Sequence, residues 1–384
     1  MLGNRTNMLT QQFSNRRTEL MRRIAQKNAV EAVMITHPVD IRYLSGATEG
    51  VSAMLSAPGG TTLFTSKMFE ARVPREAPGC SVVVGVKAFE ESAQQLKASR
   101  YRCGVGYQGG KLVHSRFLQL TEAMGRRRLV DIGETATQQR TVKDAGELRL
   151  IRQCVRIAEK AFLVLIGQGA AYLMSRTERQ LAAELEYRLC MLGADRQAFP
   201  FNGIITASGP NSASCHHFPG FRKPRAGEPL LFDWGAEKDG YRCDITRVVF
   251  MGEPDKRMRE IFEVVSAANK AGIAAIHAGA LCADVSDAGW NVVREAGFGD
   301  HIRHGLGHGF GLEIHEPPGI GAGGSQAASA DSARLEANMV VTVEPGIYIE
   351  GKGGVRLEDD VLVTPKGHKV LTTLPNDLAS AVLH

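Results

Sequence analysis

Short strand-like runs alternate with amphipathic stretches up to about residue 140 of the chain. Runs rich in strand-forming residues occur at 32–35, 61–64, 81–84 and 103–106. Apolar residues recur at helical spacing in 18–26, 90–97 and 115–124. Strands that alternate with helices are typical of α/β architecture, so we expect a small α/β domain at the N-terminus.

A single apolar stripe follows this region. Apolar residues recur there every three or four positions, at Leu148, Ile151, Val155, Ala158, Phe162 and Leu165. This spacing predicts an amphipathic helix that begins a second domain. From residue 200 onward the pattern changes to strand-like runs bounded by Gly-rich turns, with helical stretches at 256–278 and 284–296. The length of 384 residues also fits two domains.

Composition excludes several classes of protein. The chain has 46 Lys and Arg against 41 Asp and Glu, a formal net charge of +5, and 43% of its residues are hydrophobic. Disordered chains have lower hydrophobicity and larger net charge, and the 42 glycines lack the period of collagen. The positive charge is too diffuse to predict a nucleic-acid partner, and we interpret its densest run, 126–128, as a solvated helix end.

Cysteine usage and hydropathy predict a cytoplasmic protein. The seven cysteines form no CxxC pair and no regular framework, so we expect reduced, mostly buried thiols. No run approaches the roughly 18 consecutive apolar residues of a membrane-spanning helix. Residues 1–17 lack the apolar core of a signal peptide. We therefore expect no membrane partner.

Two aspartates flank a predicted tight turn. The Lys-Asp-Gly sequence at 238–240 separates two strand-like runs and is typical of a β-hairpin. Asp233 and Asp244 are almost symmetric about this turn, so we expect them near each other across the two strands. Because side chains alternate along a strand, Asp233 points away from the apolar side taken by Phe232 and Trp234.

Two glutamates repeat this arrangement. The runs 340–346 and 355–361 flank a Gly-rich turn at 351–354, and Glu344 and Glu358 are symmetric about it. Each hairpin thus presents a pair of carboxylates from largely apolar strands. Facing like charges repel, and a buried carboxylate must be paired, protonated or metal-bound. The alternative is four unrelated surface acids on exposed edge strands, each paired with a separate basic residue.

Three histidines, His304, His308 and His315, lie in the Gly-rich segment 304–316. One neutral imidazole beside four carboxylates makes an oxygen-rich set of five ligands, and four negative charges balance two divalent cations. Such ligands suit Mn²⁺, Co²⁺ or Fe²⁺ at least as well as Zn²⁺. The intervening glycines argue against a helix that would pair His304 with His308, so we interpret His304 as a structural or supporting residue.

The sequence resembles the creatinase/prolidase/methionine-aminopeptidase family of "pita-bread" metallohydrolases, and within it the microbial Xaa-Pro dipeptidases. The motifs that carry the resemblance span about residues 200–365 and are Asp233-x10-Asp244 with Ile245-Thr246-Arg247, Gly307-His308-Gly309-Phe310-Gly311 with His315-Glu316, Thr342-Val343-Glu344-Pro345-Gly346 and Arg356-Leu357-Glu358-Asp359-Asp360. Upstream, Arg42-Tyr43-Leu44-Ser45-Gly46 and Lys143-Asp144-x2-Glu147 are similar to the N-terminal domain and domain junction of the prolidase branch. The resemblance implies a creatinase-like α/β N-terminal domain over 1–142 and an α+β pita-bread hydrolase domain over 143–384.

The resemblance also implies a dinuclear metal site. Its ligands would be Asp233, Asp244, His308, Glu344 and Glu358. The implied cofactors are two divalent ions, Mn²⁺ or Co²⁺, with Zn²⁺ or Fe²⁺ as alternatives. All five ligands are present, whereas creatinase itself and the non-catalytic relatives have lost members of this set.

The resulting hypothesis is metal-dependent hydrolysis of the Xaa-Pro bond in dipeptides or short peptides by a water activated between two metal ions. Glu344 would be both ligand and proton shuttle to the leaving nitrogen. His216 and His315 would bind the substrate and stabilise the oxyanion, although His217 leaves the first assignment ambiguous by one residue. Arg356 would either anchor the substrate carboxylate or neutralise the metal-site carboxylates.

Two alternatives concern function. One is a small C–N hydrolase of the ectoine hydrolase or creatinase-like kind, and the other is a catalytically inert binding module. The family also implies a homodimer. The partner implied as substrate is a short proline-containing peptide. The Gly- and Ala-rich stretch 319–333 is interpreted as a surface loop, either a flap near the cleft or an insertion.

Overall fold

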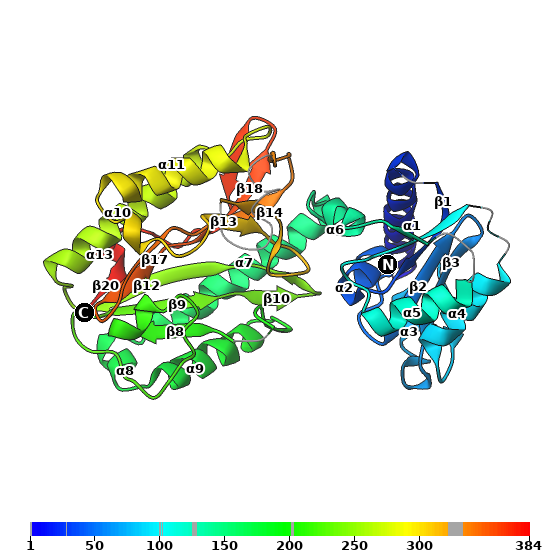
Figure 1. Ribbon diagram of the computed structural model, residues 1–384. Coiled ribbons are helices and arrows are strands. Elements are labelled where there is room, and N and C mark those ends of the chain that lie inside the picture. Colours follow the sequence, from blue (N-terminus) through cyan, green and yellow to red (C-terminus); the bar gives the residue numbers. More distant parts are fainter. Residues whose placement is uncertain are drawn as a thin grey trace. The chain divides into compact units, whose positions relative to one another are not determined.

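The structure is a computed structural model that describes residues 2–27, 29–99, 101, 103–124, 129–200, 203–321 and 333–384. The chain forms two compact units, Met1–Arg140 and Thr141–His384 (Figure 1). The basic run 126–128 and residues 322–332 of the predicted loop lie outside the described residues. The loop prediction was wrong at its start, because Gly319 and Ile320 belong to a strand.

The first unit is built on a six-stranded mixed sheet with the order β4-β3-β2-β1-β5-β6. β1 is antiparallel to β2 and parallel to β5, so the sheet combines a meander with crossover connections. The strands are β1 (Val30–Ile35), β2 (Val51–Ala57), β3 (Gly60–Thr65), β4 (Ser81–Val84), β5 (Gly104–Tyr107) and β6 (Leu129–Asp131). The α/β prediction for this region is confirmed, although the strand at β2 was not predicted.

Helices cover this sheet. They are α1 (Leu2–Lys27), α2 (Pro38–Ser45), α3 (Val73–Glu76), α4 (Ala88–Ala98), α5 (His114–Met124) and α6 (Thr135–Arg140). Phe89 and Leu96 of α4 and Leu120 of α5 share one apolar cluster with Met34 and Phe64 of the sheet. Burying this amphipathic face provides the main driving force for folding of the unit.

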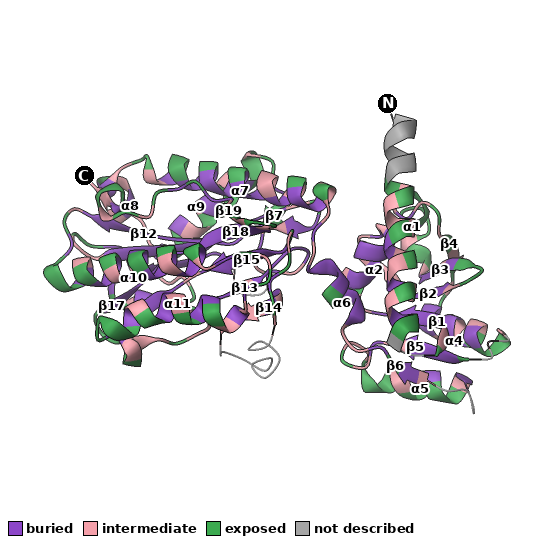
Figure 2. Cartoon of the chain, turned by 90° about the horizontal axis from the view of Figure 1, so that it is seen from above, coloured by how far each residue is buried: buried purple, intermediate pink, exposed green. Residues whose placement is uncertain are grey.

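The second unit packs strands between two pairs of helices (Figures 1 and 2). Its main helices are α7 (Ala145–Ile166), α9 (Glu178–Met191), α10 (Lys256–Ala274) and α11 (Cys282–Glu295), with the shorter α8 (Ala170–Met174) and α13 (Leu378–Ala381). Asp144 and Glu147 form a capping box at the start of α7, which fixes where that helix begins. No described helix is long and apolar enough to cross a membrane.

Two sheets carry the strands that matter for the site. One has the order β20-β12-β9-β8 and the other β14-β13-β15-β18-β19, with a separate β16-β17 hairpin. These strands are β8 (Ile205–Ser208), β9 (Pro229–Trp234), β12 (Ile245–Met251), β13 (Gly307–Gly309), β14 (Glu316–Ile320), β15 (Val340–Val343), β16 (Gly346–Ile349), β17 (Gly353–Arg356), β18 (Asp359–Thr364), β19 (Gly367–Val370) and β20 (Val382–Leu383). A small sheet adds β7 (Arg196–Gln197), β10 (Ala236–Lys238) and β11 (Tyr241–Arg242).

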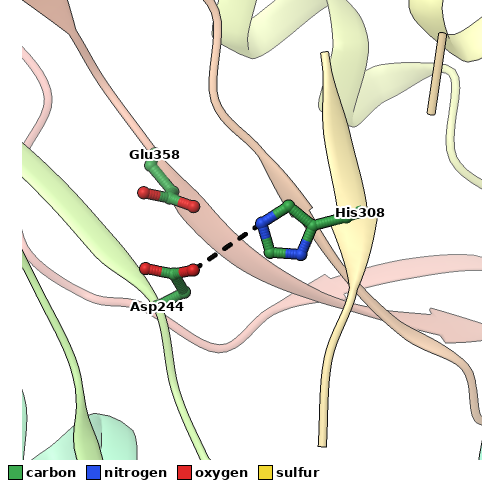
Figure 3. Close-up of side chains that lie close together, drawn as sticks. All are labelled: Asp244, His308 and Glu358. Carbon is green, nitrogen blue, oxygen red and sulfur yellow. Dashed lines mark ion pairs between the residues drawn. The ribbon is translucent and has the colours of Figure 1, made fainter. Parts of the chain in front are cut away.

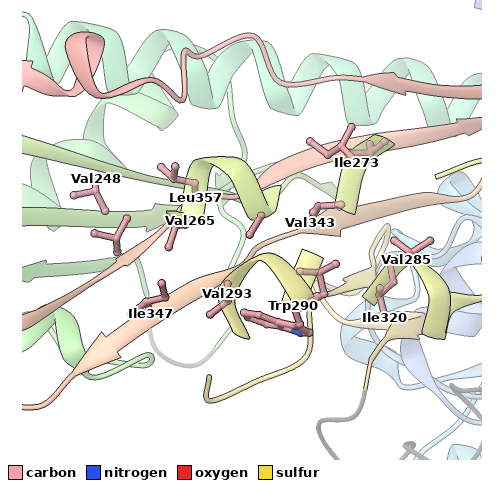
Figure 4. Packing of buried hydrophobic residues seen from close by; sticks show 14 of the residues in the cluster. Val248, Val265, Ile273, Val285, Trp290, Val293, Ile320, Val343, Ile347 and Leu357 are labelled. Atoms are coloured by element: carbon pink, nitrogen blue, oxygen red, sulfur yellow. The ribbon is translucent and has the colours of Figure 1, made fainter. Parts of the chain in front are cut away.

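One apolar core fixes these strands against α10 and α11. Val265 of α10 and Trp290 of α11 pack with Val343 of β15, Ile347 of β16 and Leu357, which follows β17 (Figure 4). Such a close-packed core holds the strand ends in place, and it is from those ends that the predicted ligands extend.

The opposite side of β9 packs on α7. The Trp234 ring stacks on Phe162 with a centroid distance of 4.4 Å, and Phe232 meets the same ring edge-on at 5.6 Å. Trp234 Nε1 also donates a hydrogen bond to the Ala158 carbonyl oxygen at 3.1 Å. The predicted alternation is therefore confirmed, because Asp233 lies between two residues that face α7 and must itself face the other way.

The cysteine prediction is correct only in part. All seven cysteines are free thiols, but only Cys154, Cys243 and Cys282 are buried. Cys103 and Cys190 are exposed, so the expectation of mostly buried thiols was wrong.

Candidate metal centre

The five predicted ligands all lie in the second unit. Asp233 is in β9, Asp244 immediately precedes β12, His308 is in β13, Glu344 follows β15, and Glu358 lies between β17 and β18. Four of these positions are within or beside strands whose residues are buried, so the side chains are held by the sheets and not by mobile loops.

The first hairpin forms as predicted, with one difference in register. Asp239 and Gly240 at its turn have φ of 49° and 82°, values that a two-residue hairpin turn of this kind requires. β9 and β12 continue the same antiparallel pairing, in which Asp233 is opposite Thr246. Asp244 is therefore a diagonal neighbour of Asp233 and not directly opposite it.

The second hairpin places its two glutamates directly opposite each other. Val343 pairs with Asp359 in β15–β18, and Gly346 pairs with Arg356 in β16–β17. Both pairings have the same register, so Glu344 and Glu358 occupy facing positions between them. The predicted symmetry of this pair is confirmed.

Thr246 and Glu358 join the two hairpins. The Glu358 backbone N–H donates to the Thr246 carbonyl oxygen at 3.1 Å. The Thr246 hydroxyl donates to Glu358 Oε2 at 2.6 Å. This bridge brings carboxylates that are more than a hundred residues apart in the sequence to one place.

His308 faces the carboxylates. Figure 3 shows its ring directed at Asp244, with Glu358 beside them. Nε2 of the ring lies 3.7 Å from Asp244 Oδ2 and 3.4 Å from Glu344 Oε1. Ligand atoms of Asp244, His308 and Glu358 all lie within 4.8 Å of one another.

The tautomer of His308 follows from its other nitrogen. Nδ1 lies 3.0 Å from the Gly309 carbonyl oxygen, which can only accept, so Nδ1 carries the proton. Burial lowers the pKa of His308 to about 3, and the ring is therefore neutral. Nε2 consequently directs a lone pair toward two carboxylates, an arrangement that a cation would stabilise.

The carboxylates disfavour one another's ionisation. Burial and the charges of Glu358 and Asp233 raise the pKa of Asp244 well above its ordinary value. Burial and the charges of Glu344 and Asp233 do the same to Glu358. Burial raises the pKa of Glu344 to about 8, against the opposing effect of Arg356. Four ionised carboxylates here need compensating positive charge.

Two of the predicted ligands each have a buried carboxylate oxygen with no hydrogen-bond partner among the described residues, as does the neighbouring Asp360 at its Oδ1. The two ligand oxygens are Asp233 Oδ1 and Asp244 Oδ1. Buried polar atoms are normally hydrogen-bonded, so unpartnered oxygens beside a histidine lone pair fit a bound cation. The donor set of four carboxylates and one imidazole suits divalent ions of the Mn²⁺, Co²⁺, Fe²⁺ and Zn²⁺ series.

Arg356 is buried among these residues, with 3% of it exposed. Its Nη2 donates to Asp233 Oδ2 at 2.5 Å, its Nε to the Thr246 hydroxyl at 3.0 Å, and its Nη1 to the Tyr348 hydroxyl at 2.8 Å. The Tyr348 hydroxyl in turn lies 2.8 Å from His304 Nε2. All three guanidinium nitrogens are therefore engaged within the protein.

His216 and His315 lie close to the site. The His308 and His315 rings have centroids 4.4 Å apart. Burial lowers the pKa of His315, and the neighbouring His216 lowers it further, while Asp233 opposes this effect. His216 is thus close enough to His315 to act on it electrostatically. His217 turns elsewhere, because its Nε2 lies 2.8 Å from Glu178 Oε2.

Comparison with known proteins gives the family. Residues 149–365 match the model of metallopeptidase family M24. The chain belongs to metallopeptidase family M24. Residues 17–142 match the creatinase/prolidase N-terminal domain, which confirms the family and the fold class expected from the motifs. The chain is therefore a metallopeptidase, and its family uses divalent metal ions. The alternative of an inert binding module is set aside.

M24 relatives cover nearly the whole chain. The Xaa-Pro dipeptidase of Pyrococcus furiosus is 32% identical over 94% of this chain and 99% of its own length. A solved Xaa-Pro dipeptidase from Bacillus anthracis has a TM-score of 0.86 at 29% identity, covering 96% of this chain and 99% of its own. A solved X-Pro aminopeptidase from Thermotoga maritima has a TM-score of 0.83 at 31% identity, covering 95% and 99%.

Sequence reasoning missed two residues that contact the side chains and segments of this site. Tyr348 lies just beyond the predicted strand-like run 340–346, and nothing in its spacing indicated a contact with Arg356 and His304. Glu178 is fully buried and contacts the segment that carries His216. The one available signal was the Thr177-x-x-Gln180 capping box, which places Glu178 at the first position of α9.

Proposed function

We propose that this M24 metallopeptidase hydrolyses the Xaa-Pro bond of dipeptides or short peptides. The observation that carries the proposal is that the carboxylates of Asp244, Glu344 and Glu358 gather beside the lone pair of His308. Asp233 is close enough to raise the pKa values of Asp244 and Glu358. The proposal is supported by similarity to Xaa-Pro dipeptidases that extends over nearly the full length of those relatives. The proposed ligands of two divalent ions are Asp233, Asp244, His308, Glu344 and Glu358, with Mn²⁺ or Co²⁺ as the ions.

Two bound cations would supply Lewis acidity and a water of lowered pKa at neutral pH. Glu344 is the proposed proton carrier. It accepts the proton of the attacking water and delivers it to the nitrogen of the breaking C–N bond. A prolyl nitrogen is a secondary amine and leaves only when protonated.

His216 and His315 are the proposed substrate-binding pair. A neutral imidazole can donate one hydrogen bond to the scissile carbonyl oxygen or to the substrate carboxylate, and that bond strengthens as negative charge develops on the oxygen. Arg356 is proposed to neutralise the carboxylate cluster. Its contacts with Asp233, Thr246 and Tyr348 support this role over the anchoring of a substrate carboxylate.

A metal-reconstitution assay tests the proposed function. Protein stripped with EDTA and reloaded with Mn²⁺ or Co²⁺ should bind about two ions per chain and release proline from Xaa-Pro dipeptides. Asp244→Asn and Glu358→Gln should abolish turnover. The matched control is Asp239→Asn, which replaces a carboxylate by an amide on the exposed turn of the first hairpin and should keep wild-type activity.

The substrate panel decides between peptides and smaller molecules. It contains Xaa-Pro dipeptides, Xaa-Pro tripeptides, creatine and ectoine. Turnover confined to creatine or ectoine would contradict the proposal, as would equal turnover by EDTA-treated enzyme. We also propose a homodimer, which light scattering tests by reporting about twice the mass of one chain.

A further inference from the structure

Glu178 is a buried carboxylate outside the metal site, with no exposed side-chain surface. It stands at the first position of α9, which runs beside β8 (Figure 1). A buried carboxylate without a Lys or Arg contact among the described residues must be stabilised by hydrogen bonds. Its five donors all come from the segment 208–222, which we call the His216 loop.

Each carboxylate oxygen holds a different part of the His216 loop. Oε1 accepts from the Ser208 backbone N–H and hydroxyl, both at 2.7 Å, and from Asn211 Nδ2 at 2.9 Å. Oε2 accepts from His217 Nε2 at 2.8 Å and from the Gly220 backbone N–H at 3.0 Å. His216 therefore lies between two groups of residues that are bound to the same carboxylate.

The backbone at the start of α9 adds two further contacts. The Glu178 N–H donates to the Arg222 carbonyl oxygen at 2.9 Å, and the Arg179 N–H donates to that of Gly220 at 3.1 Å. Arg222 Nη1 closes the loop by donating to the Ser208 hydroxyl at 2.8 Å. The two ends of the His216 loop are thus joined to each other and to one helix end.

The two adjacent histidines face different partners. His217 is bound to Glu178, while His216 is close enough to His304 and His315 to contribute to the lowering of both pKa values, after burial as the main cause. The Cys215 carbonyl oxygen, next to His216 in the chain, accepts a hydrogen bond from Arg356 Nη1 at 3.5 Å, so this part of the His216 loop lies beside the metal centre. His217 therefore holds the loop, and its neighbour His216 lies at the site.

We propose that Glu178, through His217, is a positioning residue that sets the place of His216 beside the metal centre. The proposal rests on the proposed function, in which His216 contacts the substrate. Displacing a group that contacts the reacting atoms by about 1 Å costs on the order of 100-fold in rate. Loss of the Glu178 contacts should therefore lower kcat far more than it changes KM.

A double-mutant cycle tests whether Glu178 acts through His216. In Glu178→Gln, the amide nitrogen replaces one carboxylate oxygen. It cannot accept a hydrogen bond from the donors of the His216 loop, so the contacts of at least one of the two oxygens are lost. We expect kcat to fall by about 100-fold, with the metal content unchanged. In the His216→Ala background, adding Glu178→Gln should lower kcat by less than about a further threefold. Fully multiplicative losses would mean a general structural role and would overturn the proposal.

A matched pair at His217 separates the contact from the imidazole itself. His217→Gln can still donate from its amide nitrogen to Glu178, whereas His217→Leu of similar size cannot. His217→Gln should keep kcat within about threefold of wild type, and His217→Leu should lose as much as Glu178→Gln. Equal damage in both variants, or wild-type kcat in His217→Leu, would overturn the proposal.

Amide hydrogen exchange gives a readout that does not depend on turnover. In metal-free protein, His217→Leu and Glu178→Gln should speed exchange of the Gly220 amide at least about tenfold, and His217→Gln should not. If the wild type cleaves no Xaa-Pro peptide, the proposed function fails while the exchange result still tests the loop contact. Unchanged exchange in both damaging variants would overturn the positioning role itself.

Discussion

Arg356 Nη2 lies 2.5 Å from Asp233 Oδ2, and this contact joins β17 to β9 at the metal centre. The Arg356 side chain is 3% exposed and that of Asp233 is 11% exposed. The guanidinium contacts the Asp233 carboxylate, and its positive charge also opposes the rise in the pKa values of Glu344 and Glu358. The first prediction follows from this pair.

Arg356→Gln should lower the free energy of unfolding of the metal-free protein by about 3 kcal/mol, because it leaves Asp233 buried without its partner. Urea unfolding followed by tryptophan fluorescence measures this change, since Trp234 and Trp290 both lie in the second unit. Arg225→Gln, at an exposed arginine, should change the free energy by less than about 0.5 kcal/mol. Equal effects of the two substitutions would refute the prediction.

Thr246→Val should destabilise the protein, whereas Thr206→Val should not. The Thr246 hydroxyl donates to Glu358 and accepts from Arg356, so its removal leaves two buried groups short of a partner. The equally buried Thr206 hydroxyl has no partner in the described structure. We expect a loss of about 1–3 kcal/mol for Thr246→Val and no loss or a gain for Thr206→Val. Urea unfolding of both variants in parallel decides this, and a similar loss in both would count against it.

Metal removal should lower the unfolding temperature. Binding to the folded state alone stabilises it, so Mn²⁺ at about 100 times its dissociation constant should raise the unfolding temperature by about 5 °C or more. Asp244→Asn should remove this increase. Without metal, the variant should unfold at a higher temperature than wild type, because it removes a buried carboxylate whose ionisation its neighbours disfavour. Differential scanning calorimetry with and without EDTA tests both signs, and a full metal-induced increase in the variant would contradict the ligand assignment.

Asp40 should make stability depend on pH in the acid range. Burial raises the pKa of Asp40, but the hydrogen bond with His37, the Arg140 charge and the Gln108 hydrogen bond outweigh this effect and lower it. A carboxylate with a lowered pKa stabilises the folded state above its unfolded pKa of about 3.9, and this stabilisation is lost as the pH falls through the folded value.

The comparison of wild type with Asp40→Asn isolates this effect, because the other titrating groups are common to both proteins. The difference in their free energies of unfolding should be constant from about pH 7 to pH 5 and should shrink below about pH 4. Urea unfolding at a series of pH values measures it. A difference that grew on acidification would show that the pKa of Asp40 is raised instead of lowered.

Much of the fold could be predicted because its signals are local. The predicted helix over 148–165 is the core of α7, and the stretch 256–278 contains α10, which ends earlier, at Ala274. A helix end depends on caps and packing that periodicity does not show, which explains this difference. β2 was missed because its sequence, VSAMLSA, mixes small and apolar residues without clear alternation.

The candidate site could be predicted where strand pairing is set by a turn. Once Asp239 and Gly240 form a tight turn, the register of both strands follows, and Glu344 and Glu358 face each other for the same reason in the second hairpin. The same register makes Asp244 a diagonal neighbour of Asp233. This offset became visible only from the residue pairs of β9 and β12 in the structure.

By itself, the sequence determined the two hairpins, the family and the set of candidate ligands, because hairpin symmetry and ligand type both follow from short motifs. Only the tertiary structure decided how those residues are supported. The contacts of Arg356 with Asp233, and of Glu178 with His217, join residues 123 and 39 positions apart. No periodicity connects such positions, because the pairing of buried charges is set by how whole strands and helices pack.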